Sequence, residues 1–276
     1  MQPQPAGRRL LELAVPAPTG RWWRSRPDDF KTAPNMAHGT AGIAYCLATL
    51  ATATGEPEFA EAALEGAAYL LSIARTEGGM CGVHHHEVAG TDLYMLGFCS
   101  GSTGLGCLFV RLYQMTGDGA WLDWTGRAAA TVTGSGLPAR LYPGFWDNVA
   151  QCCGSAGVAD FFLGLHALTG NLAHLQFAVA VLDDILDRAV LDELGMRWHN
   201  VEHTASPPAL PAQTGWMRGA AGIGATLLRA HLLLTGSGTG RWLPSWPFAE
   251  IEAPRSAALP AEASPALSDS DGAGWG

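Results

Sequence analysis

The sequence predicts an all-α fold in which helical hairpins stand around a common centre as an incomplete α/α toroid. Three observations predict it. A segment that begins with a G-x-x-G motif occurs four times, helical periodicity follows the motif within each copy of this segment, and each copy ends on Thr-Gly. The copies occupy residues 38–55, 100–117, 153–170 and 218–236. A repeat of this size implies units that cannot bury their apolar faces alone and therefore stack side by side.

Each copy is predicted to be an inner helix. Apolar residues such as Val158, Phe162 and Leu165 recur at intervals of three and four, which is helical periodicity. The closing glycine of each copy suits a left-handed C-terminal cap. A second helical pattern follows the first three copies, so each of these units is a helical hairpin with an outer helix. The predicted outer helices are 58–74, 121–132 and 172–190.

The paired glycines indicate crowding at the start of each inner helix, because they remove side chains there. Residues just before the first glycine would then face the centre. Eight equivalent positions result, and we call them the slots. The slots hold two sets of four residues: Ala37, Cys99, Cys152 and Met217, then His38, Ser100, Cys153 and Arg218.

Three cysteines in the slots predict a zinc site. Zinc that performs chemistry usually has three protein ligands and an open fourth position, and Cys99, Cys152 and Cys153 would supply three thiolates. A helix N-terminus favours the thiolate form. A substrate thiol would bind at the open position, and His38 would move a proton. The alternative is that these are buried free cysteines acting as small apolar residues.

Other polar and sulfur-containing residues have weaker patterns. We expect Cys46 and Cys107, which lie within inner helices, to be core residues. The run His84, His85, His86 is a candidate second metal site, although loop histidines are more often surface groups. Three further residues lie in loops that lead to the slots and either line the mouth of the ring or are solvated: Asp147, Glu202 and His203.

Composition excludes several classes of protein. The chain has 276 residues, 48% of them hydrophobic, and a net charge of -9 without a basic cluster, so we expect no nucleic-acid partner. No apolar run reaches the roughly 20 residues that span a bilayer. The N-terminus is a poor secretory signal, and we expect a cytoplasmic protein. Six cysteines in a chain of this size favour metal binding or catalysis over a disulfide framework.

Four segments resemble the lanthionine synthetase C-like (LanC-like) family: AHGTAG, FCSGSTG, QCCGSAG and MRGAAG, within about residues 27–236. The resemblance implies a seven-hairpin α/α toroid with a central zinc ion, of which this chain holds the C-terminal four units. It implies that Cys99, Cys152 and Cys153 bind zinc and that His38 is the acid/base. Family members add a peptide cysteine, or a small thiol such as glutathione, to dehydroalanine or dehydrobutyrine and form a thioether.

The sequence departs from the family pattern at three places. No catalytic aspartate precedes His38 in a matching motif, the segment LYMLGFC lacks the arginine expected before Cys99, and Ser100 replaces an aromatic residue or histidine. Four units cannot close a seven-unit ring, so we expect a truncated protein, an incomplete gene model or half of an assembly. Zinc binding therefore has more support than catalysis.

Three functions compete. The first is zinc-dependent thiol addition, and the second is a truncated, non-catalytic zinc-binding toroid that binds a peptide or partner. A glycosidase is disfavoured, because no paired carboxylates stand in the slots. Expected partners are a peptide or small-thiol substrate, and a dehydratase or kinase or the missing half of the toroid. The expected organisation is a loose segment 1–26, a toroid domain 27–251 and a disordered tail 252–276.

Overall fold

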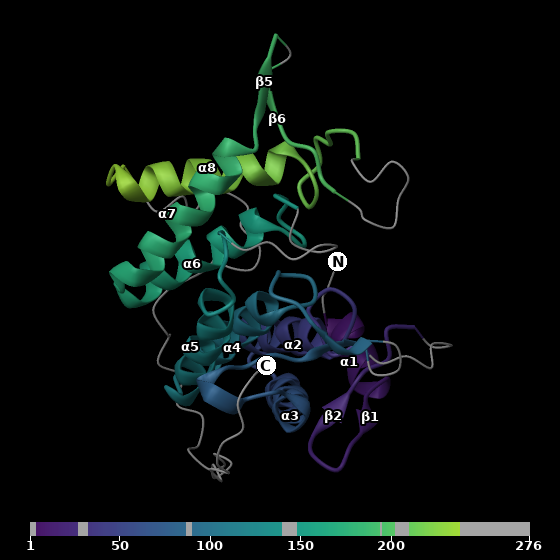
Figure 1. Cartoon of the computed structure of the whole chain (residues 1–276). Coiled ribbons are helices and arrows are strands. Elements are labelled where there is room, and N and C mark those ends of the chain that lie inside the picture. The colour runs from purple at the N-terminus through teal and green to yellow at the C-terminus, as the bar shows by residue number, and fades with distance from the viewer. Residues whose placement is uncertain are drawn as a thin grey trace.

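The computed structural model describes residues 4–26, 33–86, 90–139, 148–193, 195–201 and 210–237 (Figure 1). The helices are α1 Gln4–Glu12, α2 Thr40–Thr54, α3 Pro57–Ile73, α4 Ser102–Thr116, α5 Ala120–Thr133, α6 Ser155–Thr169, α7 Leu172–Asp187 and α8 Ala220–Leu234, with a short 3-10 helix at Glu77–Gly79. The strands are β1 Val15–Pro16, β2 Arg21–Trp22, β3 His84–His86, β4 Gly90–Tyr94, β5 Val190–Asp192 and β6 Gly195–Arg197. The described part of the chain is thus mostly helical.

All four inner helices are where the repeat predicts them. Helices α2, α4 and α6 each begin directly after the first glycine of their motif, and each ends on a glycine in the left-handed conformation. These C-cap glycines donate their backbone N–H to a carbonyl in the last turn, which satisfies a group that the helix leaves unpaired. Helix α8 also begins after its glycine, Gly219.

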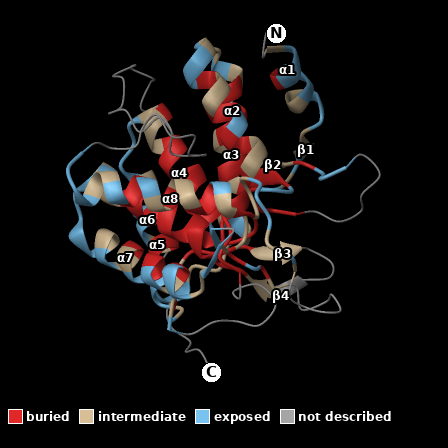
Figure 2. Ribbon diagram, turned by 90° about the horizontal axis from the view of Figure 1, so that it is seen from above, coloured by how far each residue is buried: buried red, intermediate tan, exposed pale blue. Residues whose placement is uncertain are grey.

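The helices pack as the predicted hairpins. Helix α2 packs on α3, α4 on α5, and α6 on α7, while the inner helices contact one another in the order α2, α4, α6, α8. Figure 2 shows the buried residues gathered where the helices meet. Large side chains such as Phe59, Phe109, Phe161 and Phe162 are fully buried there. Burial of each contributes roughly 1.5–3 kcal/mol of hydrophobic stabilisation.

The described part of the chain contains three antiparallel hairpins that were not expected from the sequence. Strand β1 pairs with β2, β3 with β4, and β5 with β6. The outer helix predicted to reach residue 190 ends at Asp187, and β5 begins at Val190. Helical periodicity alone cannot separate the last turn of an amphipathic helix from a short strand that follows it.

The expectation of a loose N-terminal segment is wrong for residues 4–26. Helix α1 and the β1–β2 hairpin are held by Trp23, which is 1% exposed and donates its indole N–H to the carbonyl of Leu10 over 2.7 Å. Its backbone N–H donates to Thr40 Oγ1 over 3.2 Å. Trp23 thus connects this segment to the start of α2. The predicted tail, 252–276, lies outside the described residues.

The second glycine of each motif allows the preceding loop to fold over the helix. A Cβ atom on Gly42, Gly104, Gly157 or Gly222 would overlap the carbonyl oxygen of the residue six positions earlier. These carbonyls belong to the residues just before the slots, namely Met36, Phe98, Gln151 and Trp216. The glycines therefore set the path of the backbone that carries the slot residues.

We predict that Gly222→Ala destabilises the protein by about 1–3 kcal/mol, because the added methyl group meets the backbone of Trp216 and the side chain of Gln151. Gly224→Ala, two residues along the same helix, is the matched control. A Cβ atom on Gly224 would have no neighbour within 4 Å, so this change should stabilise α8 by about 0.5–1 kcal/mol. Denaturant unfolding measures both values. Equal effects of the two changes would contradict this account of the motif.

Candidate metal centre

A chain of backbone hydrogen bonds joins the four slot loops. Ala37 N–H donates to the carbonyl of Cys99 over 2.8 Å. Cys99 N–H donates to the carbonyl of Cys152, and Cys152 N–H to the carbonyl of Met217, each over 2.9 Å. The first set of four slot residues is therefore linked in repeat order, as the alignment of the copies predicts. Four loops distant in sequence meet at one place.

Three cysteine thiols lie together at this place. The Sγ atoms of Cys99, Cys152 and Cys153 are all within 4.8 Å of one another. Cys99 is buried and the other two are half-buried, and none of the six cysteines forms a disulfide. Gly97 packs against the backbone of Cys153, which fixes the third thiol relative to the loop of the first. Among the described residues, these three cysteines form a group whose spacing could hold a metal ion.

The thiols influence one another strongly. Hydrogen bonds from Cys153 and Cys99, together with the positive charge of Arg218, lower the pKa of Cys152 to about 3, although burial opposes the shift. The interaction with Cys152 in turn raises the pKa of Cys99 well above its usual range and that of Cys153 to about 11. Cys152 is the acceptor in this cluster. Three sulfur donors fixed at helix starts suit a thiophilic divalent ion, and zinc is the ion that thiolates most often bind in proteins.

Two other slots hold side chains that can take part in chemistry, namely His38 and Arg218. The imidazole of His38 is exposed, and the hydrogen bond from Ala37 brings its loop beside Cys99. Ser25 Oγ donates a hydrogen bond to the carbonyl of His38. Arg218 is half-buried, and its carbonyl accepts a hydrogen bond from Asn200 Nδ2 over 2.5 Å. Its charge lowers the pKa of Cys153 as well as that of Cys152.

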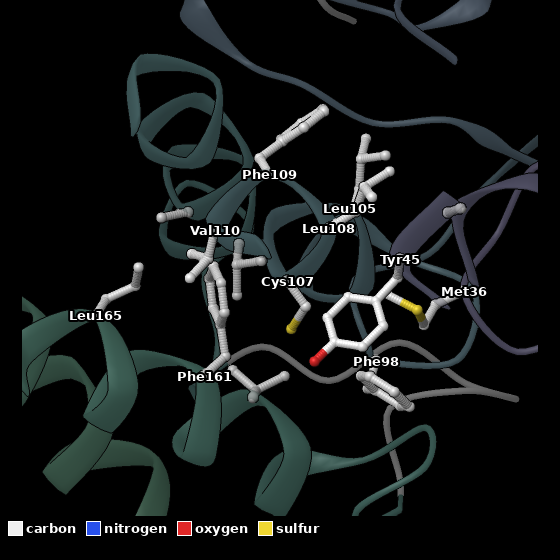
Figure 3. Close-up of a cluster of buried hydrophobic side chains, with 14 of the residues drawn as sticks. Met36, Tyr45, Phe98, Leu105, Cys107, Leu108, Phe109, Val110, Phe161 and Leu165 are labelled. Atoms are coloured by element: carbon white, nitrogen blue, oxygen red, sulfur yellow. The ribbon is translucent and has the colours of Figure 1, made fainter. Parts of the chain in front are cut away.

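The other candidates have mixed outcomes. Cys107 is 2% exposed, as predicted, and Figure 3 shows it among Tyr45, Phe98 and Phe161. The prediction that Cys46 is a core residue is wrong, because its side chain is exposed. Cys46 and Ala53 are two turns apart on α2 and both exposed, so this face of the helix is turned away from α3 and α4.

The histidine run forms strand β3 rather than an irregular loop, and its three side chains are half-buried. A second group of candidates, Asp147, Glu202 and His203, lies outside the described residues. Sequence reasoning also missed a role for asparagine near the slots. Asn35 and Asn200 are each 2% exposed and hydrogen-bond to the backbone of slot loops. An asparagine has no distinctive spacing, so only the folded structure reveals this function.

Two buried polar pairs between inner helices were also not expected. Arg229 Nη1 on α8 lies 2.6 Å from Asp160 Oδ1 on α6, and Arg111 Nη2 on α4 donates to Tyr45 Oη on α2 over 2.9 Å. The two pairs occupy equivalent positions of the repeat. Counted from the first glycine of each motif, the acceptors stand in the same register, and so do the two arginines. This shared register is the sequence signal from which the two pairs could have been predicted.

No helix of the described residues has the length and apolar character needed to cross a membrane. In structural comparisons, the chain resembles the Lin0763 protein from Listeria innocua with a TM-score of 0.58 at 15% identity. The match covers 84% of this chain and 65% of that one. It also resembles a glycoside hydrolase family 76 mannosidase, Bt3792 from Bacteroides thetaiotaomicron, with a TM-score of 0.46 at 14% identity over 78% of this chain and 58% of that one.

The comparison with Lin0763 supports the helical fold alone, and the chain spans less than two thirds of the length of that protein. A comparison with curated protein sequences gave no match. The family described as lanthionine synthetase C-like protein matches residues 32–232, which include all four G-x-x-G motifs and the three clustered cysteines. The match extends over well more than half of the sequence, so the chain belongs to the lanthionine synthetase C-like family.

Proposed function

We propose that the protein binds one zinc ion through Cys99, Cys152 and Cys153 and adds a thiol to dehydroalanine or dehydrobutyrine, with His38 as the acid/base. The observation that carries the proposal is the convergence of the three thiols on equivalent helix starts, within 4.8 Å of one another. Zinc, when bound, supplies a Lewis acid that keeps a substrate thiol ionised at neutral pH. The thiol donor would be a peptide cysteine or a small thiol of the glutathione type.

The residues divide the remaining work. Addition forms a bond between the thiol sulfur and Cβ of the dehydro residue, breaks the carbon–carbon π bond and leaves negative charge at Cα. His38, in its protonated form, donates a proton to Cα and regains one from the next incoming thiol. The sum of the two steps is the addition of S–H across the double bond. The positive charge of Arg218 beside Cys152 and Cys153 offsets the excess of negative charge at three thiolates.

A second candidate function is a zinc-binding module without activity, which binds a peptide or another protein. The absence of an arginine in the segment LYMLGFC favours it. In either case we propose that the four units form an arc of an α/α toroid in a cytoplasmic protein. Its partners would be a dehydratase or kinase that prepares the peptide, or the rest of the toroid.

Metal analysis followed by an addition assay tests the proposal. We expect about one zinc per chain in protein purified without chelator. Zinc-loaded protein should then form a thioether from a dehydroalanine peptide and a thiol, measured by mass spectrometry, and His38→Asn should slow this by roughly 100-fold or more with zinc content unchanged. Zinc without an adduct would favour the binding module. Protein without zinc would rule out the site itself.

A further inference from the structure

The β3–β4 hairpin carries His85 to the neighbourhood of His38 on a fixed base. Cys81 N–H donates to Thr131 Oγ1 of α5 over 2.8 Å, and that hydroxyl donates back to the carbonyl of Cys81 over 3.1 Å. Gly82 forms an antiparallel β-bridge with Arg75, and Val83 is 1% exposed. Figure 2 shows β3 at the edge of the helical part. The strand therefore begins from an anchored and buried segment.

Asn35 connects His85 directly to the slot loop. Its Nδ2 donates to the carbonyl of His85 over 3.1 Å, and its Oδ1 accepts the backbone N–H of His38 over 3.0 Å. Asn35 is 2% exposed, so water competes little for these hydrogen bonds. One buried amide thus fixes the backbone of His38 relative to that of His85.

The imidazoles of this region interact. The rings of His85 and His86 have centroids 4.0 Å apart, although neighbouring residues of a regular strand point to opposite faces. The irregular register between His84 and His86 explains the close approach. Among the described residues, the charged groups that act on His85 are His86 of β3 and His38 of the loop before α2. Burial, then His86 and His38, lower the pKa of His85 to about 4, so its ring is neutral near pH 7.

A neutral imidazole beside an acid/base histidine has a specific use. The two nitrogens of His38 can serve proton transfer only if the ring is held in one tautomer and one orientation, which a hydrogen-bonding neighbour provides. Other enzymes use a carboxylate for this purpose. In this structure the β3–β4 hairpin offers the imidazole of His85 as a neighbour, because Asn35 links the backbone of His85 to that of His38.

We propose that His85 is the positioning residue of His38, holding its imidazole in one tautomer through a hydrogen bond, either direct or through one water molecule. The inference rests on the proposed function for its catalytic consequence, and it makes a physical claim that holds without activity. His85 keeps its own proton throughout. The proton that reaches Cα is the one carried by His38.

Nitrogen chemical shifts of the imidazoles in zinc-loaded protein test the physical claim. The signals of His38 are assigned by their loss in His38→Asn. We expect one tautomer of His38 in the wild type, a mixture in His85→Gln, and the wild-type pattern in His84→Gln. His84 is the matched control because it lies on the same strand and is equally half-buried. Unchanged His38 signals in His85→Gln would overturn the proposal, whether or not the protein is active.

The addition assay tests the consequence. His85→Gln should lower kcat by about 10- to 100-fold while KM for the thiol and zinc content stay unchanged, as for other partners that orient a functional histidine. His85→Asp should recover most of the lost kcat and move the alkaline limb of the pH profile upward, because a carboxylate stabilises the imidazolium. It also serves as the second variant if His85→Gln does not fold. An effect of His84→Gln equal to that of His85→Gln, or lost zinc, would indicate a structural role and overturn the proposal.

Discussion

Cys152→Ser should abolish tight zinc binding, the largest functional effect that we expect from one substitution. Cys152 accepts hydrogen bonds from both other thiols and is half-buried, so the change removes the central donor of the cluster with little change of volume. A serine hydroxyl stays protonated at neutral pH and is a poor ligand for zinc. We expect zinc to fall from about one ion per chain to a trace, measured by elemental analysis, with loss of thiol addition.

The same variant should differ in stability only when zinc is present. A ligand that binds the native state alone at about 1,000 times its Kd stabilises that state by about 4 kcal/mol. The midpoint of thermal unfolding should therefore be lower for Cys152→Ser in excess zinc and similar to the wild type in chelator. Cys46→Ser is the matched control, because Cys46 is exposed on α2 and should change stability by no more than about 0.5 kcal/mol. A zinc-independent loss of stability in Cys152→Ser would indicate a packing role for the thiol.

The repeat made much of this site predictable from sequence. Local geometry determines where the cysteines lie. A helix that begins after Gly154 places Cys152 and Cys153 at its start, whatever the rest of the chain does. The four loops were thus expected to meet. A series of backbone hydrogen bonds, which begins at Ala37 and ends at Met217, joins them in the order of the repeats. The regular hydrophobic spacing likewise predicted α2, α4, α6 and α8.

The parts that were not predicted depend on tertiary contacts. Helix α1 and the β1–β2 hairpin fold back on α2 around the buried Trp23, and a segment rich in Pro and Gly has no periodicity to indicate these elements. His85 is near His38 because a buried asparagine bridges two loops. Cys46 is exposed because its helix face lacks a packed neighbour among the described elements, whereas Cys107, at the next inner helix, is covered by α6.

The buried pair Asp160–Arg229 gives the second large prediction. The side chains of Asp160 and Arg229 are 4% and 7% exposed, and removal of one partner leaves a buried charge without compensation. Asp160→Leu should therefore destabilise the protein by about 3–5 kcal/mol. The double variant Asp160→Leu with Arg229→Met removes both charges, and its free energy of unfolding should be near that of the wild type or higher. Asp184→Ala is the control, because the Asp184–Arg188 pair is more exposed and should contribute no more than about 1 kcal/mol.

The pH dependence of stability follows from the same pair. Burial raises the pKa of Asp160 to about 6, although Arg229 opposes the shift, and the usual pKa of an unfolded aspartate is about 3.9. Between these values the folded state holds a proton that the unfolded state releases, so this carboxyl stabilises the fold fully below about pH 4 and loses that contribution as pH rises through about 6. Urea unfolding at pH 4.5 and 7 should show this fall in the wild type and not in the double variant. An equal dependence in both would mean that Asp160 is ionised throughout the range. Because a buried ion pair contributes little net stability, we expect apolar contacts to hold α8 on α6, and we expect the pair to favour the register in which the two helices meet.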